Sequence, residues 1–373
     1  MGYDATQPLD QAAANQAPER LLMKGAEAIA EAAIRAGCKN FFGYPITPQN
    51  EIPEYMSARL PEVGGTFVQA ESEVASINML YGAGSAGVRC LTSSSSPGLS
   101  LMSEGFSYLI GSEVPAVVVN IMRGGPGLGN IAPSQGDYLQ MTRGFGHGDQ
   151  KAIVLAPASV QEAVDVMGLA FDLSEKYRNP VVVIGDGLIG QMMEPVVFPP
   201  NVQSTTEKAW ATTGKPTTRK RNIINSLYLD AETLEQHVLH LFKKFGQMEK
   251  EEQRSELYLT DDAPEIVICA FGTTARIAKS AIKVLRAQGI RVGLFRPITA
   301  WPFPETAFQS LVEQTQVFLS IEMSMGQLVQ DIRLQVAGRK PVEFWGRTGG
   351  VVPTAEEMVL QVQKLHHKIA SQR

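Results

Sequence analysis

Short apolar runs alternate with longer amphipathic segments along most of the chain, and this alternation limits the possible folds more than any other feature. The longest apolar runs, such as Val114–Val119 and Pro180–Ile184, have the length of single strands and contain no charged residue. Strands that are apolar along their whole length are typical of parallel sheets covered on both faces. Alternation of such strands with helices predicts an α/β fold with a doubly wound parallel sheet.

Helical and strand patterns can be assigned along the first half of the chain. Helices are predicted at Gly25–Ala36, Glu73–Gly82, Gly98–Leu109 and Val160–Lys176, and strands at Asn40–Tyr44, Thr66–Gln69, Val88–Thr92, Ala116–Met122 and Val181–Ile184. A further helix is expected to begin at Pro48 with Thr47 as its cap. Thr accepts hydrogen bonds from free helix N–H groups, and Pro suits the first helical position.

A second α/β unit begins at Glu265. Its predicted strands are Ile266–Phe271, Ile290–Phe295, Val317–Glu322 and Val342–Phe344, and its predicted helices are Ala275–Gln288 and Gln327–Val336. An amphipathic helix starting at Asp230 interrupts the irregular stretch between the two units. We therefore divide the 373 residues into a flexible N-terminal extension (1–20), a first domain (21–198), a linker with the amphipathic helix (199–262) and a smaller domain (263–373).

Composition excludes several classes of function. The formal net charge is −5, and no basic patch points to a nucleic-acid partner. No apolar run approaches the roughly 18 residues that a membrane span requires. No Lys or Arg precedes Arg20, so a secretory signal is not expected and the cytoplasm is the expected location.

A metal site carried by this chain alone is not expected. Cys38, Cys90 and Cys269 lie far apart and form no CxxC pair, which excludes a zinc site, an iron–sulfur cluster and a disulfide framework. His237 and His240 stand three residues apart on the amphipathic helix, but we expect no carboxylate beside them.

Three glycine-rich segments have parts of phosphate-binding motifs without the required context. Gly82–Gly87 fits G-x-G-x-x-G, but a helix precedes it and a strand follows, which disfavours a nicotinamide-dependent dehydrogenase. Gly124–Gly129 follows a strand but lacks the Gly-Lys-Ser/Thr of a P-loop, so it stays a candidate ligand loop at a strand end. Gly185–Gly187 (GDG) begins the Mg²⁺–diphosphate motif of thiamine enzymes, yet no Asn follows at the required spacing.

Three segments together resemble one enzyme family. They are Gly43–Pro48 (GYPITP), Gln69–Ala75 (QAESEVA) ahead of Tyr81–Ala83, and Met122–Pro126 (MRGGP). They are similar to the α subunit of the thiamine-diphosphate-dependent 2-oxoacid:ferredoxin oxidoreductases. The similarity covers nearly everything after residue 20 and continues through Arg221–Ser226, Phe295–Thr299 and Gly346–Pro353. It implies a thiamine-diphosphate-binding domain of the pyrimidine type, a linker and a smaller domain like the C-terminal domain of transketolases.

The resemblance also implies a reaction and a set of partners. Family members decarboxylate a 2-oxo acid oxidatively, transfer the acyl group to coenzyme A, release CO2 and pass electrons to ferredoxin. A β subunit is expected to hold the diphosphate, Mg²⁺ and an iron–sulfur cluster, and γ and ferredoxin-like δ subunits are expected beside it. A non-catalytic scaffold subunit of such a complex is the alternative from another class.

The substrate type depends on one loop region. Residues 133–138 followed by 146–149 are more similar to the branched-chain (2-oxoisovalerate) type than to the 2-oxoglutarate type, and pyruvate is a further alternative. His147, between two glycines, is a candidate substrate contact, with an ordinary loop residue as the other interpretation.

The resemblance assigns the carboxylate that hydrogen-bonds the aminopyrimidine ring to Glu73. Such a Glu works from a poorly solvated pocket. From pattern alone, Glu73 is an acidic residue in the first turn of a helix, where the helix dipole favours it. Glu71 is the alternative residue for this role.

Five further residues complete the predicted site. Thr47 is expected beside the thiazolium ring and the substrate. Arg123 is expected to bind the substrate carboxylate, because a guanidinium forms two parallel hydrogen bonds with it; a surface salt bridge is the alternative. Ser94, Ser95 and Ser96 follow a predicted strand and are expected to line the cofactor cavity, although serines in a turn give the same pattern.

Overall fold

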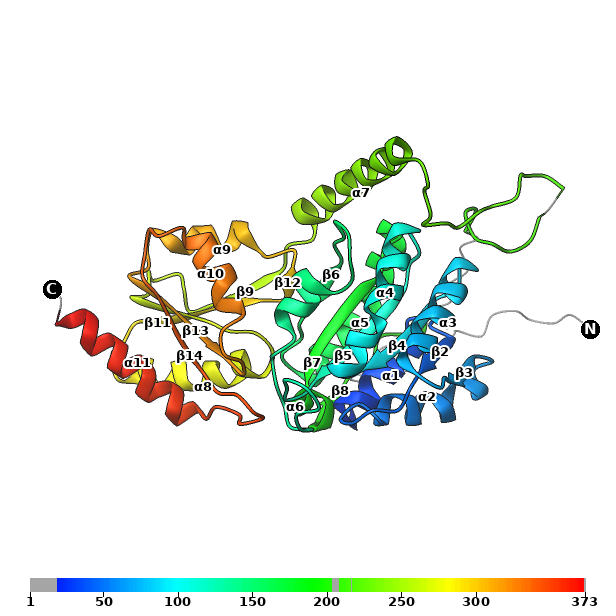
Figure 1. Ribbon diagram of the computed structural model, residues 1–373. Coiled ribbons are helices and arrows are strands. Elements are labelled where there is room, and N and C mark those ends of the chain that lie inside the picture. The colour runs from blue at the N-terminus through cyan, green and yellow to red at the C-terminus, as the bar shows by residue number, and fades with distance from the viewer. Residues whose placement is uncertain (1–18, 203–207, 216, 372–373) are drawn as a thin grey trace, which may run out of the picture.

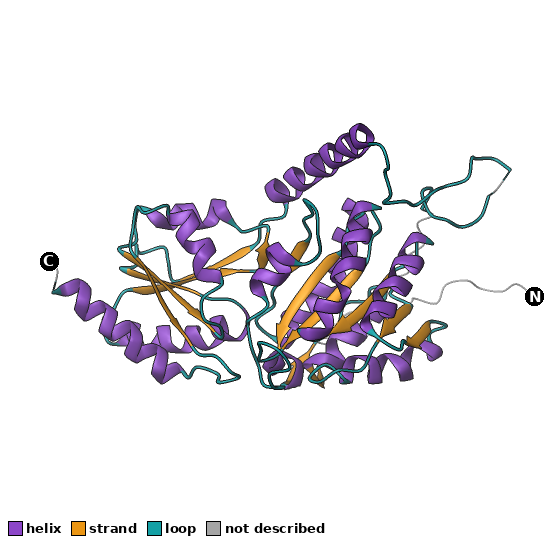
Figure 2. Ribbon diagram, viewed as in Figure 1, coloured by secondary structure: helices purple, strands orange, loops and turns teal. Residues whose placement is uncertain are grey.

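The computed structural model describes residues 19–202, 208–215 and 217–371, so nearly all of the expected extension 1–20 lies outside the described residues. Two α/β units lie side by side, and the long helix α7 (Ala231–Glu251) runs over the first unit toward the second (Figure 1). Helices lie on both sides of the strands in each unit (Figure 2). The predicted α/β class is confirmed.

The larger unit is built on a seven-stranded sheet with the strand order β12-β6-β7-β5-β4-β2-β3. Neighbouring strands are parallel except β12, which is antiparallel to β6. The strands are β2 (Asn40–Gly43), β3 (Thr66–Gln69), β4 (Cys90–Ser94), β5 (Val117–Met122), β6 (Ile153–Leu155), β7 (Val181–Asp186) and β12 (Thr299–Trp301). An antiparallel ribbon of β1 (Leu21–Lys24) and β8 (Met193–Val196) adjoins this unit.

Helices cover both faces of the larger sheet. They are α1 (Gly25–Arg35), α2 (Glu51–Glu62), α3 (Glu73–Ser85), α4 (Pro97–Gly111), α5 (Val160–Tyr177) and the short α6 (Gly187–Gln191). Helix α1 packs against α2 and α5, and α3 packs against α4. This places α1, α2 and α5 on one face and α3 and α4 on the other, as right-handed crossovers require.

The glycines of Gly82–Gly87 have a packing role. They lie at the end of α3 and are followed by β4, which confirms that a helix precedes them and a strand follows. A Cβ on Gly84 would lie 2.6 Å from the Val114 side chain and 2.8 Å from the Pro115 carbonyl oxygen, so only Gly allows this approach. The segment is therefore not a dinucleotide-binding turn.

The core of the larger unit surrounds its central strands. Strands β5 (VVVNIM) and β7 (VVVIGD) are buried at every position. They pair in register from Val117 opposite Val181 to Met122 opposite Asp186. Because both strands are fixed along their length, the residues that follow Met122 and Asp186 are held at one edge of the sheet.

The smaller unit has a five-stranded sheet with the order β14-β13-β10-β11-β9, in which only β9 is antiparallel to its neighbour. The strands are β9 (Ser255–Tyr258), β10 (Ile266–Cys269), β11 (Val292–Pro297), β13 (Val317–Glu322) and β14 (Val342–Gly346), and the helices are α8 (Gly272–Ala287), α9 (Glu305–Val312), α10 (Leu328–Val336) and α11 (Ala355–Ala370). Helix α8 packs against α11, and α9 packs against α10.

Strand β9 lies inside the stretch 199–262 that we expected to be a linker. It pairs with β11, from Leu294 opposite Tyr258 to Pro297 opposite Ser255. The stretch therefore contains an edge strand of the smaller sheet, which its short, half-polar sequence did not indicate.

The two units are joined by more than the linker. Strand β12 follows β11 of the smaller unit but pairs with β6 of the larger sheet. Arg296, which is 6% exposed in its side chain, forms salt bridges to Glu162 on α5 (2.8 Å) and to Glu256 on β9 (2.7 Å). Antiparallel pairing and a buried ion network therefore connect both units.

The start of α2 differs from the prediction. The helix begins at Glu51 and not at Pro48. The Gln49 amide donates to the Ile46 carbonyl at 3.1 Å, so residues 46–49 form a turn, and the Thr47–Pro48 peptide is cis. Thr47 is therefore not a helix cap.

Helix α7 packs on the larger unit through the predicted apolar stripe, in which Leu241, Phe245 and Met248 are buried, whereas Leu234 is 41% exposed. A carboxylate lies beside its histidines, contrary to expectation: His240 Nε2 is 3.1 Å from Glu113 Oε1. No group of three or more His, Cys, Asp or Glu among the described residues is arranged to hold a metal ion.

No helix in the described part of the chain is long and apolar enough to span a membrane.

Candidate active site

The candidate site lies where the larger sheet changes winding direction. Strands β2 and β4 are neighbours, but β2 leads through α2 to β3 on one side, and β4 leads through α4 to β5 on the other. Ligands of open α/β sheets bind at the carboxyl ends of strands at such a point. The loop that leaves β2 contains Thr47, and β4 ends at Ser94 and continues into Ser95 and Ser96.

Glu73 is buried beside this switch point. It is the first residue of α3, is 4% exposed, and accepts a hydrogen bond from Ser94 Oγ at 3.1 Å. Gly98 on α4 makes room for it, since a Cβ there would lie 2.3 Å from Glu73 Oε1 and 2.0 Å from Ser94 Oγ. Glu71, the alternative, is exposed. Of the two carboxylates, only that of Glu73 lies in a poorly solvated position next to the predicted serines.

Arg123 follows β5 and is buried, at 8% exposed. One of its terminal nitrogens, Nη1, donates to the Thr47 carbonyl oxygen at 2.8 Å, and its Nε has no hydrogen-bond partner among the described residues. It lies below the surface and bonds to a backbone carbonyl, which argues against the surface salt-bridge interpretation. A buried guanidinium with unused N–H groups is suited to bind an anion.

A cavity of about 350 Å³ opens beside Arg123. It is lined by Ser96, Pro97, Ser100, Arg123, Gly124–Gly127, Asp137 and Gln140. The glycine-rich loop predicted as a ligand loop therefore forms one wall of the cavity, and a bridge between Arg123 and Pro133 closes the base of that loop.

Thr47 and Ser95 have polar atoms near the same edge. Thr47 Oγ1 accepts a hydrogen bond from Asn50 Nδ2 at 3.3 Å, and Thr47 is half-buried. The Ser95 hydroxyl is buried and has no hydrogen-bond partner among the described residues. A buried hydroxyl without a partner is costly, and it indicates a group that a ligand satisfies.

Ser96 is held in a conformation that is unusual for a residue other than Gly, with φ of 28°. Its Oγ donates to Asp137 Oδ2 at 2.6 Å and accepts from the Arg123 amide at 3.0 Å. Asn120 Nδ2 also donates to Asp137 Oδ2, at 2.9 Å. Such outliers persist where neighbouring contacts fix them, and they concentrate at functional sites.

Sequence reasoning missed Asp137 and Asn120. Burial raises the pKa of the Asp137 carboxyl, while hydrogen bonds from Ser96 and Asn120 and the charge of Arg123 oppose this rise. Asn120 could have been found from the sequence, since it is the only polar residue in the apolar strand VVVNIM. Asp137 lies in the segment 133–138 that indicated the substrate type, but its contacts with Ser96 and Asn120 arise only when folding brings that loop to the site.

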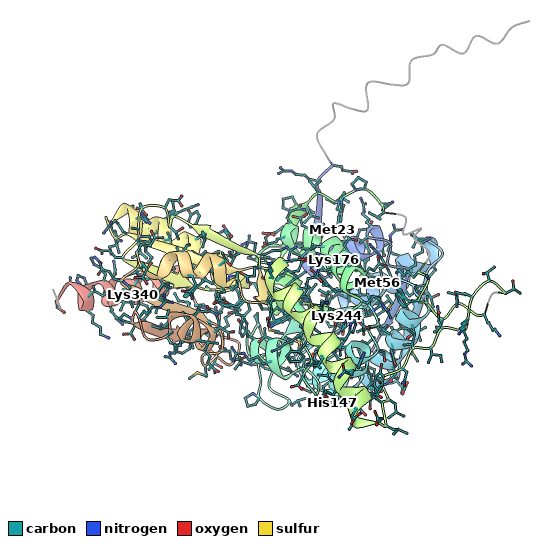
Figure 3. All side chains as sticks on the ribbon, turned by 90° about the horizontal axis from the view of Figure 1, so that it is seen from above. Met23, Met56, His147, Lys176, Lys244 and Lys340 are labelled. Atoms are coloured by element: carbon teal, nitrogen blue, oxygen red, sulfur yellow. The ribbon has the colours of Figure 1, made fainter. Side chains whose placement is uncertain are left out.

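His147 is separated from the other candidates. His147 is exposed (labelled in Figure 3). Its ring stands edge-on to Tyr108, and its carbonyl accepts from Ser107 Oγ at 2.7 Å. Ser107 is ten residues along α4 from Pro97, a distance of roughly 15 Å at 1.5 Å per residue. This position favours the interpretation of His147 as an ordinary loop residue over that of a substrate contact.

Asp186, in the Gly-Asp-Gly segment, has a structural partner for each carboxylate oxygen. Oδ1 accepts from the amides of Leu188 and Ile189 at 3.0 and 3.2 Å and from Thr273 Oγ1 at 2.8 Å. The Thr273 amide donates to Oδ2 at 3.4 Å. Asp186 thus caps α6 and joins it to α8, and burial raises the pKa of its carboxyl.

A larger cavity, of about 410 Å³, lies away from this edge. Its walls include Arg143, Lys151, Trp301, Glu305 and Asp331, and none of the predicted site residues. Within this larger cavity, Arg143 is already paired with Asp331. The larger volume is therefore not a reason to place the candidate site there.

Two family models match the chain. Residues 31–258 match the thiamine-diphosphate-binding domain of the pyruvate flavodoxin/ferredoxin oxidoreductases, and residues 264–358 match core domain II of pyruvate:ferredoxin oxidoreductase. The fold and the site at its switch point therefore define a subunit of a thiamine-diphosphate-binding oxidoreductase.

Relatives narrow this class. The ketoisovalerate oxidoreductase subunit VorB of Methanothermobacter thermautotrophicus is 48% identical over 345 residues, which cover 92% of this chain and 97% of that protein. The 2-oxoglutarate synthase subunit KorA of the same organism is 34% identical, covering 93% of this chain and 99% of its own. The chain belongs to the 2-oxoacid:ferredoxin oxidoreductase family.

Solved structures agree with this assignment. A 2-oxoglutarate:ferredoxin oxidoreductase from Magnetococcus marinus superposes with a TM-score of 0.85 at 27% identity, over 93% of this chain and 65% of that chain. A split-gene transketolase superposes with a TM-score of 0.54 at 12% identity and shows the fold alone.

Proposed function

We propose that this chain forms the half of a thiamine-diphosphate site that binds the aminopyrimidine ring and the 2-oxo acid. The complete complex would oxidatively decarboxylate a branched-chain 2-oxo acid to acyl-CoA and CO2 and pass electrons through iron–sulfur clusters to ferredoxin. One observation carries the proposal: a buried carboxylate, Glu73, and a buried guanidinium bonded to a backbone carbonyl, Arg123, lie at the same switch-point edge.

The residues present fit the pyrimidine end of the cofactor. Glu73 presents a carboxylate to which Ser94 is the only hydrogen-bond donor among the described residues, and Ser95 adds an unused hydroxyl. When bound, thiamine diphosphate supplies the carbon nucleophile and the electron sink for decarboxylation. Glu73 would hold and share a proton with the ring, and Gly98 keeps the carboxylate against α4 and away from water.

The remaining residues are assigned to the substrate. Arg123 would bind the substrate carboxylate through the nitrogens that it does not use on the Thr47 carbonyl. Thr47 stands beside it and would contact the reacting end of the 2-oxo acid. Glycines 124, 125 and 127 would let the loop follow the substrate as it enters.

A partner chain is proposed to hold the diphosphate and Mg²⁺. Asp186 is the residue of the Gly-Asp-Gly segment that would ligate a metal, but α6 and Thr273 already occupy its carboxylate. We therefore assign the diphosphate, the metal and an iron–sulfur cluster to a β subunit, with γ and ferredoxin-like δ subunits completing the complex. The three cysteines are free and buried thiols, which suits a reducing cytoplasm.

A branched-chain substrate is supported by the 48% identity to a ketoisovalerate oxidoreductase subunit, against 34% to a 2-oxoglutarate synthase subunit. The test is coenzyme A-dependent ferredoxin reduction by the complex purified with its native partners, with 2-oxoisovalerate, 2-oxoglutarate and pyruvate compared. We expect the highest kcat/KM for 2-oxoisovalerate. A preference for 2-oxoglutarate would contradict the proposed branched-chain substrate but not the proposed oxidative decarboxylation. Undiminished turnover in a Glu73→Gln, Arg123→Ala double variant would favour the scaffold alternative.

A further inference from the structure

The smaller unit clamps the loop that carries Asp137. Gln135 Nε2 donates to the Phe271 carbonyl at 2.8 Å, and its Oε1 accepts from the Met323 amide at 3.0 Å. Gln327 accepts from the Leu139 amide at 2.8 Å and donates to the carbonyl of Gly136. Backbone groups on both sides of Asp137 are thus bonded to a side chain of the smaller unit.

Asp137 itself points to the larger unit, where its carboxylate determines which groups donate and which accept in a hydrogen-bond network. Its Oδ2 accepts from Ser96 Oγ and from Asn120 Nδ2. Because both groups donate to Asp137, Ser96 Oγ is free to accept from the Arg123 amide, and Asn120 Oδ1 accepts from the Ser96 amide at 3.2 Å. A carboxylate only accepts hydrogen bonds, so it fixes which partner donates along the network.

We propose that Asp137 is a positioning residue for Arg123, and that the smaller unit holds Asp137 in position through its contacts with the loop. Asp137 holds Ser96, and Ser96 holds the Arg123 amide at the point where β5 ends and the guanidinium turns toward the Thr47 carbonyl. This role rests on the proposed function, in which Arg123 binds the 2-oxo acid. It gives the smaller unit a part in substrate binding although its side chains do not line the cavity.

The first experiment needs no activity. Site-resolved hydrogen exchange on the full chain would compare the wild type with Asp137→Ala, Asp137→Asn and Gln327→Ala. Loss of the charge-assisted contact in Asp137→Ala should speed exchange of the Arg123 amide about tenfold. Asp137→Asn keeps an accepting oxygen and should restore most of the protection. Gln327→Ala should give an intermediate increase, because it removes the clamp and not the carboxylate.

The second experiment uses the complex with its native partners. Asp137→Ala should raise the KM for the 2-oxo acid about tenfold and change kcat much less, and Asp137→Asn should recover most of the loss. Asp165→Asn and Asp165→Ala, at an exposed position on α5, are matched controls and should behave as wild type.

Unchanged exchange of the Arg123 amide in Asp137→Ala would overturn the inference. So would faster exchange with an unchanged KM, because Asp137 would then be structural only. If the wild-type complex oxidises no 2-oxo acid, the proposed function fails, while the exchange experiment still tests the link from Asp137 to Arg123.

Discussion

Two carboxylates only two residues apart differ in environment, and this difference leads to a prediction at the scale of single residues. Glu73 is 4% exposed and bonded to Ser94, whereas Glu71 is exposed. Glu73→Gln should lower kcat by about 10²–10⁴-fold with little loss of cofactor affinity, since an amide cannot share the proton. Glu71→Gln is the matched control and should be nearly silent. If Glu71→Gln lowers kcat in steady-state assays and Glu73→Gln does not, Glu71 and not Glu73 is the carboxylate that binds the aminopyrimidine ring.

Arg123 allows a second prediction at this scale. Arg123→Lys keeps the charge but loses the planar fork that reaches both the Thr47 carbonyl and a carboxylate. Hydrogen bonds to charged groups contribute about 1.5–3 kcal/mol, so the KM for the 2-oxo acid should rise by about 10- to 150-fold. Thiamine diphosphate affinity should hardly change. Arg333→Lys, at an exposed position on α10, is the control. An unchanged KM, measured with coenzyme A saturating, would contradict the contact between Arg123 and the substrate carboxylate.

Packing of α4 against Glu73 gives a prediction at the scale of secondary-structure elements. A Cβ on Gly98 would lie 2.3 Å from Glu73 Oε1, which requires the carboxylate or the helix to move. Gly98→Ala should therefore lower turnover although the carboxyl group stays in the chain. Gly82→Ala on α3 is the control. Apart from its chain neighbours and the nearby backbone of its own helix, no atom lies within 4 Å of a Cβ there, and Ala is favoured over Gly within a helix by roughly 0.5–1 kcal/mol. A Gly98→Ala complex with wild-type kcat would contradict the proposed role of Glu73.

The C-terminal end of α7 gives a second prediction at this scale. Burial raises the pKa of the Glu252 carboxyl, but hydrogen bonds from Lys176, Tyr177 and Arg254 outweigh it and lower the pKa to about 2 (Lys176 is labelled in Figure 3). Since the folded-state pKa is below the ordinary 4.5, the contacts stabilise the fold fully above pH 4.5 and are lost as the pH falls toward 2.

Thermal unfolding of Glu252→Gln measures this effect. The variant should have a lower Tm than the wild type at pH 7. The difference should shrink below pH 4.5, where the carboxyl begins to be protonated in the unfolded wild-type chain but stays ionised in the folded one. Glu249→Gln, at an exposed position on α7, serves as the control. A difference in Tm that is independent of pH would mean that the contacts contribute through packing and not through charge.

At the scale of the whole molecule, the proposed function gives this chain half of a site that a partner chain completes. Ser95 and Arg123 have polar atoms without a hydrogen-bond partner among the described residues. Asp186, in contrast, is fully engaged in holding α6 and α8. We therefore expect the chain purified alone to be colourless and to bind thiamine diphosphate weakly. Calorimetry with Mg²⁺ present tests this, with the assembled complex as the positive control. Stoichiometric, metal-dependent binding by the isolated chain would contradict the division of the site between subunits.

The sequence by itself determined the fold class and the order of most elements. Strands β5 (Val117–Met122) and β7 (Val181–Asp186) are buried at every position. Their bounds were predicted to within two residues, because a run of apolar side chains is stable only in the interior. The amphipathic helix α7 and the packing role of Gly82–Gly87 followed from local patterns in the same way. The motifs around Glu73 and Arg123 identified the family before any contact was known.

Only the tertiary structure decided which of the candidate residues lie together. It grouped Glu73, Ser94 and Arg123 at one sheet edge, placed His147 at the far end of α4, and added Asp137 from a loop held by the smaller unit. Strands β9 and β12 were missed because short edge strands acquire their structure from a partner far away in the chain. Hydrophobic periodicity is a local property and is written in the sequence, whereas the meeting of two distant polar groups depends on how whole elements pack.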